Sequence, residues 1–139
     1  MLCVEDFLDA LKWTKEVGGL SGLISRSMNN LNIIKNWISE SHWADFLCED
    51  VNNLSSTSIC LKLVDPKIIN LPLETKNNIE KYIVKLLEEH EVAFDIGSYR
   101  SAPPGLRIWG GPTVENDDVK NLLPWLDWAY NESLDYLKI

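Results

Sequence analysis

Cysteine is scarce in this sequence, and so is any segment that would direct the chain to a membrane. The cysteines are Cys3, Cys48 and Cys60, an odd number without CxxC spacing, so neither a disulfide framework nor a zinc site is indicated. No apolar run approaches the roughly 18 residues that span a bilayer. The first residues, MLCVEDFLDAL, lack both a basic region and a small-residue cleavage site. We therefore expect a reduced, cytoplasmic protein with no metal and no membrane partner.

Positive charge and histidine are also scarce. Against 21 Asp and Glu there are 13 Lys and Arg, so the formal net charge is -8. Because nucleic-acid affinity depends on clustered cations that neutralise phosphates, we expect no nucleic-acid partner. His42 and His90 lie at expected helix ends, where imidazoles commonly cap a helix or face solvent. No Ser-His-Asp or Cys-His arrangement and no signature of a Schiff-base lysine stands out, so the sequence names no catalytic residue.

What the sequence does contain is enough for one folded unit, since 45% of its 139 residues are hydrophobic. Apolar residues at helical spacing predict helices, which cover residues 4–15, 20–42, 74–90 and 116–134. The pair Gly18 and Gly19 is expected to end the first of them. Short β-rich runs predict strands in the segments DFLCEDV, STSICLKLVDP, VAFDIGSYR and GLRIWGG. The expected order is strands followed by a helix, and then strands followed by a second helix. This order predicts a two-layer α/β (α+β) unit with a small, mostly antiparallel sheet packed by two helices.

The two leading helices do not belong naturally to that two-layer unit. We expect residues 1–43 to connect to another domain and residues 44–139 to form the two-layer domain. Both leading helices carry apolar stripes, from Val4 to Leu11 and from Leu20 to Ile38. Exposed apolar patches tend to mark interfaces, and two-fold association is the commonest closed arrangement of identical chains. We therefore expect a homodimer.

The segment YRSAPPGLRIWGG, residues 99–111, holds two of the three arginines of the chain, Arg100 and Arg107. A guanidinium is always charged and matches a carboxylate or a phosphate with two parallel hydrogen bonds. Arg107 lies among apolar residues, where an unpaired charge is costly, so it requires an anionic partner. An ion pair with Asp95 or Glu115 would meet that requirement, and so would the anionic group of a ligand. From the residues alone, the ion pair is the more ordinary interpretation.

Three stretches carry a family resemblance: MLCVEDFLDALKW, LVDP and YRSAPPGLRIWGGPTVENDDVKNLLPWLDWAY. Together they resemble the C-terminal part of the phosphoserine aminotransferases. These are fold-type I enzymes that use pyridoxal 5'-phosphate to transfer an amino group between glutamate and 3-phosphohydroxypyruvate in serine biosynthesis. The resemblance implies an aminotransferase small domain preceded by connecting helices. In the full enzyme, it implies the substrates phosphoserine, 3-phosphohydroxypyruvate, glutamate and 2-oxoglutarate.

The resemblance also assigns roles to the two arginines. Arg107 matches the small-domain arginine that binds the substrate α-carboxylate, and Arg100 matches the arginine near the substrate phosphate. Tyr99 stands where the family often has histidine. The lysine and the aspartate that hold the cofactor in the family lie upstream of every residue here. We therefore expect the isolated chain to bind no pyridoxal phosphate and to be inactive.

Two functions remain open at this point. Because Met1 falls at an internal position of the family pattern, the chain is expected to be a truncated gene product, a partial reading frame or an isolated domain. The first function is that of a phosphoserine aminotransferase fragment. The alternative is a free-standing module, derived from the small domain, that binds small carboxylates or a protein partner.

Overall fold

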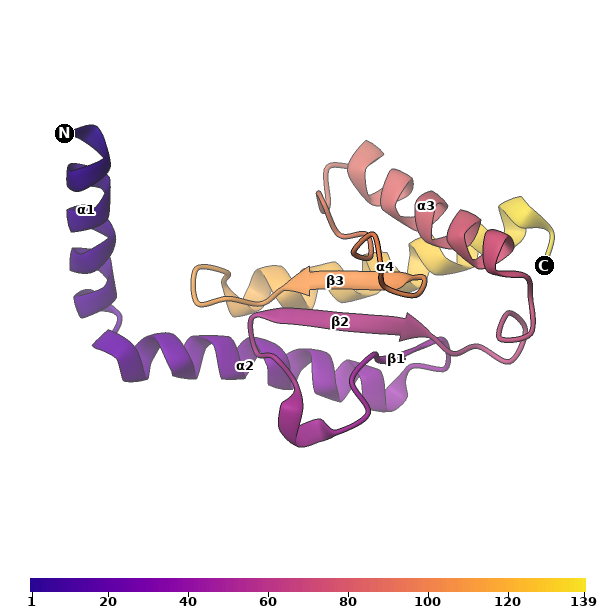
Figure 1. Ribbon diagram of the computed structural model, residues 1–139, viewed down its shortest axis with the longest axis horizontal. Coiled ribbons are helices and arrows are strands. Elements are labelled where there is room, and N and C mark those ends of the chain that lie inside the picture. Colours follow the sequence, from indigo (N-terminus) through magenta and orange to yellow (C-terminus); the bar gives the residue numbers. More distant parts are fainter.

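The computed structural model describes residues 1–139, and its first helix projects away from the other elements (Figure 1). The helices are α1 (Leu2–Glu16), α2 (Gly19–Glu40), α3 (Leu73–Glu89) and α4 (Asn116–Leu137), with a short 3-10 helix η1 (Val51–Asn53). The strands are β1 (Ala44–Phe46), β2 (Ser58–Leu63) and β3 (Gly105–Trp109). None of the helices has the length and apolar character needed to cross a membrane. The predicted fold class, helices packed on a small antiparallel sheet, is confirmed.

The sheet has the order β1-β2-β3, and both pairs of strands are antiparallel. Successive side chains of a strand point to opposite faces, and in β2 the buried residues are Ile59 and Leu61, whereas Cys60 between them is half-buried. Cys60 is the register partner of Arg107 in β3. Arg107 therefore lies on the face of the sheet that is turned away from the core.

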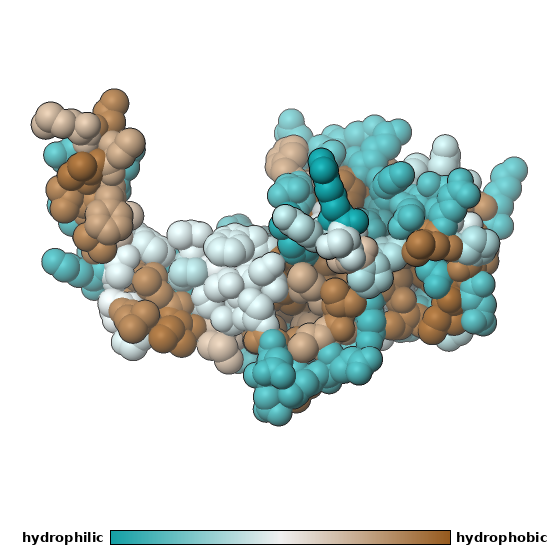
Figure 2. Space-filling view, viewed as in Figure 1, coloured by the Kyte–Doolittle hydropathy of each residue, from teal (hydrophilic) through white to brown (hydrophobic).

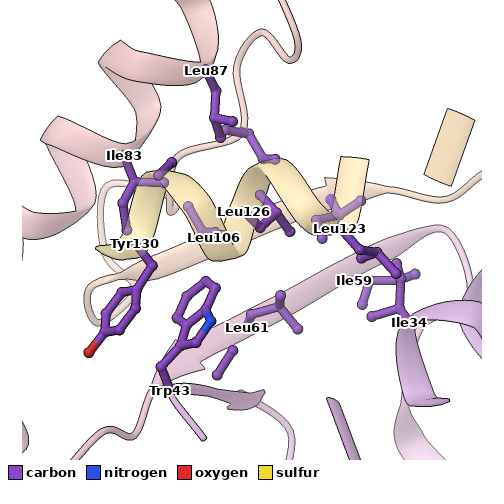
Figure 3. Close-up of a cluster of buried hydrophobic side chains, with 14 of the residues drawn as sticks. Ile34, Trp43, Ile59, Leu61, Ile83, Leu87, Leu106, Leu123, Leu126 and Tyr130 are labelled. Atoms are coloured by element: carbon purple, nitrogen blue, oxygen red, sulfur yellow. The ribbon is translucent and has the colours of Figure 1, made fainter. Parts of the chain in front are cut away.

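The core fills the space between the sheet and the helices α2, α3 and α4. Ile34 of α2, Ile83 of α3 and Leu126 of α4 are fully buried, and burial of each such side chain stabilises the fold by about 1.5–3 kcal/mol. Figure 3 shows how side chains of the helices and strands converge, with Ile34, Trp43, Ile59, Leu61, Ile83, Leu87, Leu106, Leu123, Leu126 and Tyr130 labelled. The second half of α2 thus shares this core, and the division after residue 43 stays a prediction.

Helix α1 lies outside the core, and none of its residues is buried. It meets α2 at a corner formed by Gly18 and Gly19, whose φ angles of 99° and 67° are in the left-handed region that favours glycine. A side chain at Gly22 would collide with the Val17 carbonyl oxygen, so the third glycine lets the two helices approach at this corner. The helix end that the sequence predicted at the glycine pair is confirmed, and the corner leaves α1 without a packing partner except α2.

One predicted strand does not form. In the segment VAFDIGSYR only Gly97 makes a β-bridge, to Leu106, although the Arg107 N–H donates to the Ile96 carbonyl at 2.8 Å. Asp95 adopts a φ of 53°, which is outside the extended region and interrupts the strand immediately before this contact. The expectation of a fourth strand was therefore wrong, and the segment follows the edge of β3 as a loop.

Candidate anion-binding site

Arg107 lies at the edge of the sheet with one anionic partner from its own chain. Its Nη2 is 2.9 Å from Asp95 Oδ2, and its side chain is 31% exposed, while that of Asp95 is 92% exposed. Of the two partners that the sequence offered, Asp95 is therefore the one in contact; Glu115 pairs with Arg26 instead. Exposed ion pairs contribute only about 0–1 kcal/mol, because water and salt compete with them. A ligand carboxylate can therefore displace Asp95 from Arg107 at little cost in free energy.

A cavity of about 500 Å³ opens beside Arg107. Its polar lining comes from Arg107, Asp95 and Ser58, and the rest is apolar, with Phe94 and Trp109 among the contributors. Phe94 and Trp109 are both more than half exposed. A concave, mostly apolar site with a few convergent polar groups is the usual form of a small-molecule site. The arrangement suits a small ligand whose anionic group meets the guanidinium.

Arg100 is exposed and forms no ion pair within the chain. It lies in the loop between Ser98 and Gly105, next to Tyr99. The Cζ atom of Arg107 lies 6.0 Å from the centroid of the Tyr99 ring, within the range of a cation–π contact. Tyr99 thus links the segment that carries Arg100 to Arg107, but only Arg107 lines the cavity, and Arg100 does not.

The loop that follows β3 is held by Asn30 of α2, a residue that the sequence analysis did not identify. Asn30 is fully buried, and its Nδ2 donates to the carbonyl oxygens of Gly110 at 3.2 Å and Val114 at 3.0 Å. A side chain at Gly110 would come within 2.8 Å of the Ile59 side chain, so this residue must be small. No local pattern in the sequence indicates such a contact, because its partners lie 80 and 84 residues further along the chain.

A second polar cluster joins two of the stretches that carry the family resemblance. Asp65, buried at 3% exposure, accepts hydrogen bonds from the Tyr130 hydroxyl at 2.7 Å and the Lys67 N–H at 2.8 Å. The Tyr130 ring stacks on Trp43 with centroids 4.4 Å apart (Figure 3). These bonds satisfy the carboxylate inside the fold. The cluster does not line the cavity beside Arg107.

This contact shifts the titration of both partners. Burial of Asp65 raises its pKa, but the hydrogen bonds from Lys67 and Tyr130 and the charge of His42 outweigh burial, so its pKa lies below the ordinary value. Burial raises the pKa of Tyr130, as do its hydrogen bond to Asp65 and the negative charge of that residue. The pair is therefore most favourable as a charged carboxylate with a neutral phenol.

The remaining sequence candidates lie away from the cavity. His42 is exposed, with its Nε2 3.9 Å from Asp65 Oδ2. His90 follows α3 and contacts the rings of Trp125 and Trp128. Neither histidine lines the cavity beside Arg107, and no group of three His, Cys, Asp or Glu side chains gathers as a metal site.

Comparison with known proteins shows what the whole chain is similar to. Curated phosphoserine aminotransferases from Methanosarcina barkeri (strain Fusaro / DSM 804) and Methanosarcina mazei are 45% and 42% identical over 133 and 131 residues. Both alignments cover 94% of this chain and 33% of the relative, so the chain spans about one third of the length of these proteins. No protein-family model matches the chain.

Solved structures agree with the sequence comparison. The phosphoserine aminotransferase from Bacillus circulans subsp. alkalophilus gives a TM-score of 0.68 at 25% identity, over 88% of this chain and 30% of that chain. A phosphoserine aminotransferase structure concerned with radiation damage of the Schiff base gives a TM-score of 0.67 at 17% identity, which bears on the fold alone. The fold is therefore that of an α/β unit of the aminotransferase class. Within that class the chain is related to the phosphoserine aminotransferases, and the resemblance carried by its three stretches is confirmed.

Proposed function

We propose that this chain is the C-terminal small domain, with its connecting helices, of a phosphoserine aminotransferase. The reaction is transfer of an amino group between glutamate and 3-phosphohydroxypyruvate, with phosphoserine and 2-oxoglutarate on the other side. In this proposal Arg107 binds the substrate α-carboxylate and Arg100 the phosphate. The observation that carries it is the position of Arg107, at a cavity and paired only with an exposed carboxylate that a substrate can replace.

The two arginines suit their proposed ligands for different reasons. Arg107 is partly desolvated, so a carboxylate that replaces Asp95 gains a charge-assisted, bidentate contact. Arg100 has no partner within the chain and is exposed, so it can follow a phosphate that stays partly hydrated. The apolar part of the cavity lining excludes water from the carbon skeleton of the proposed substrate. The chain's own residues thus bind and orient the substrate.

The residues of this chain do not fit pyridoxal 5'-phosphate itself. That cofactor requires a lysine for covalent attachment and supplies the electron sink of transamination. None of the lysines here is buried, and none lines the cavity beside Arg107 or the smaller one beside Cys60. We therefore infer that the isolated chain has no transaminase activity and that other parts of the full enzyme hold the cofactor.

A chimaera tests the proposal directly. This chain would replace the matching third of the Methanosarcina barkeri enzyme, to which it is 45% identical, and phosphoserine-dependent formation of glutamate from 2-oxoglutarate would be measured. We expect turnover by the chimaera and none by the isolated chain. A chimaera that folds and shows the absorbance of the bound cofactor, yet does not convert phosphoserine, would overturn the proposal.

The exposed apolar face of α1 favours the alternative function, a free-standing module that binds a protein partner. Experiments on the chimaera and on the isolated chain distinguish the two functions. Turnover by the chimaera supports the enzyme fragment, whereas a stable complex of the isolated chain with another protein and an inactive chimaera would support the module. We also propose a cytoplasmic location, since all the cysteines of the chain are free thiols.

A further inference from the structure

Glu80 of α3 joins both ends of the loop that carries Arg100. Its Oε1 accepts hydrogen bonds from the N–H and the hydroxyl of Ser98, both at 2.7 Å. Its Oε2 accepts from the N–H of Gly105 at 3.1 Å. Hydrogen bonds to an ionised carboxylate are roughly twice as strong as neutral ones. One side chain from a different element therefore fixes the two residues between which the loop turns.

Apart from the Tyr99 ring, which lies near Arg107, the loop has few other contacts that would hold it. Within it, the Ala102 N–H donates to the Tyr99 carbonyl at 2.8 Å, and this turn is local. Glu80 is half-buried and forms no ion pair with a lysine or arginine. Its negative charge is therefore balanced chiefly by the donors of Ser98 and Gly105. The position of Arg100 relative to the sheet depends on these bonds.

Gly105 adds a second constraint at the same point. A side chain there would lie 1.9 Å from the Leu61 carbonyl oxygen, so only glycine lets β3 begin this close to β2. Arg107 follows two residues later in the same strand and is fixed by the sheet. Glu80 therefore connects the loop of Arg100 to the strand of Arg107.

We propose that Glu80 is the positioning residue that sets the separation of Arg100 from Arg107. It thereby selects ligands that carry a phosphate and a carboxylate on one short carbon skeleton. This inference rests on the proposed function, because it takes the two arginines as the anion-binding groups. Glu80 itself contacts no ligand in this arrangement.

The test uses the 139-residue chain with both arginine side chains observed by NMR during titration with O-phospho-L-serine and, separately, L-serine. Glu80→Gln keeps the size of the side chain but removes its charge and one of the acceptor oxygens. We expect it to weaken binding of O-phospho-L-serine about tenfold and to leave L-serine within twofold. The Ser98 and Gly105 amide protons should also exchange with solvent about tenfold faster. Glu88→Gln, an exposed residue of the same helix, is the matched control and should change neither.

Ser98→Ala provides a milder variant in case Glu80→Gln does not fold, since it removes only the hydroxyl donor, and it should weaken O-phospho-L-serine about threefold. Unchanged binding of O-phospho-L-serine by the folded variants would overturn the positioning role and leave the proposed function intact. Equal weakening of both ligands would also overturn it, because a general loss of structure does not distinguish phosphate from carboxylate. If neither arginine of the unaltered chain responds to either ligand, the anion site is wrong and the positioning role fails with it.

Discussion

Arg100 and Arg107 differ in what surrounds them, and this difference governs their expected roles. Arg107 pairs with Asp95 and lies near the Tyr99 ring, so its guanidinium is held in place before a ligand arrives. Arg100 has no such support from an ion pair and depends on its loop. A lysine at either position would keep the charge but lose the planar fork of donors.

Arg107→Lys in the chimaera should therefore lower kcat/KM by roughly tenfold to a few hundredfold, since hydrogen bonds to charged groups contribute about 1.5–3 kcal/mol. Arg100→Ala should instead reduce activity with phosphoserine more than activity with glutamate. Steady-state kinetics with both amino acids measures the two effects, and the cofactor absorbance checks that the protein is intact. An unchanged kcat/KM for Arg107→Lys would show that Arg107 is only the ion-pair partner of Asp95.

Asp65 provides a prediction about stability and pH. Its pKa is lowered in the folded state, whereas the pKa of an aspartate in an unfolded chain is about 3.9. The unfolded chain thus takes up a proton first, and the stabilisation by Asp65, present above about pH 4, is lost as the pH falls through the folded pKa. Asp65→Asn should lower the free energy of unfolding by about 1–3 kcal/mol at pH 7 and flatten the pH dependence below 4.

Urea unfolding at a series of pH values measures this effect. Asp9→Asn, on the exposed helix α1, removes the same charge without a buried contact and serves as the control. If the unfolding free energies of Asp65→Asn and the unaltered chain fall in parallel below pH 4, the Asp65–Tyr130 contact does not contribute to acid stability.

Among the elements, α2 has the widest range of contacts. Its N-terminal half meets α1 at the glycine corner, while its C-terminal half packs into the core and carries Asn30. Arg26 of the same helix donates from Nε to the Pro112 carbonyl at 2.6 Å, and its Cζ lies 5.6 Å from the centroid of the Trp13 ring of α1. The helix therefore holds the loop after β3 and connects it to α1.

Substitutions of Asn30 test whether its side-chain amide, as a hydrogen-bond donor, holds the loop after β3. Its amide nitrogen faces carbonyl oxygens, and its Oδ1 is buried without a partner. Asn30→Ala should cost about 1–3 kcal/mol. Asn30→Asp should cost more, because a buried carboxylate would replace the donor and face the same carbonyl oxygens.

Thermal unfolding of the variants ranks them, with Asn29→Asp as an exposed control. Lower pH should recover part of the Asn30→Asp loss, because a protonated carboxyl regains one donor. A smaller loss for Asp than for Ala would contradict the hydrogen-bond arrangement around Gly110 and Val114.

At the scale of the whole molecule, the dominant feature is an uncovered apolar surface on α1 and the beginning of α2. Figure 2 shows hydrophobic residues gathered along the projecting helix. The large hydrophobic side chains exposed there are those of Leu2, Val4, Phe7, Leu8, Leu11, Leu20, Ile24 and Met28. Patches of this kind on an isolated chain favour association.

The isolated chain should accordingly form a homodimer at roughly tens of micromolar, observed by sedimentation or light scattering. Phe7→Glu combined with Leu8→Glu should yield the 15.9 kDa monomer, since charges on this face resist burial. Val51→Glu, an equally exposed apolar position in η1, should leave the dimer intact. A monomeric unaltered chain would show that α1 does not mediate self-association.

Features that depend on neighbours a few residues away could be predicted from the sequence. Helical spacing located the four helices, the glycine pair ended the first of them, and β-rich composition located β2 and β3. The scarcity of arginine drew attention to residues 99–111, of which Arg107, Ile108 and Trp109 line the cavity. These patterns are local, so they persist whatever the tertiary arrangement.

Contacts between residues far apart in the sequence could not be predicted and became visible only in the folded chain. Asp95 rather than Glu115 pairs with Arg107, and Glu115 pairs with Arg26 of α2 instead. Glu80 reaches donors 18 and 25 residues further along the chain, and Asn30 reaches acceptors 80 and 84 residues away. The side chain of one element meets the backbone of another only after helices and sheet have packed, and hydrophobic periodicity carries no record of that contact.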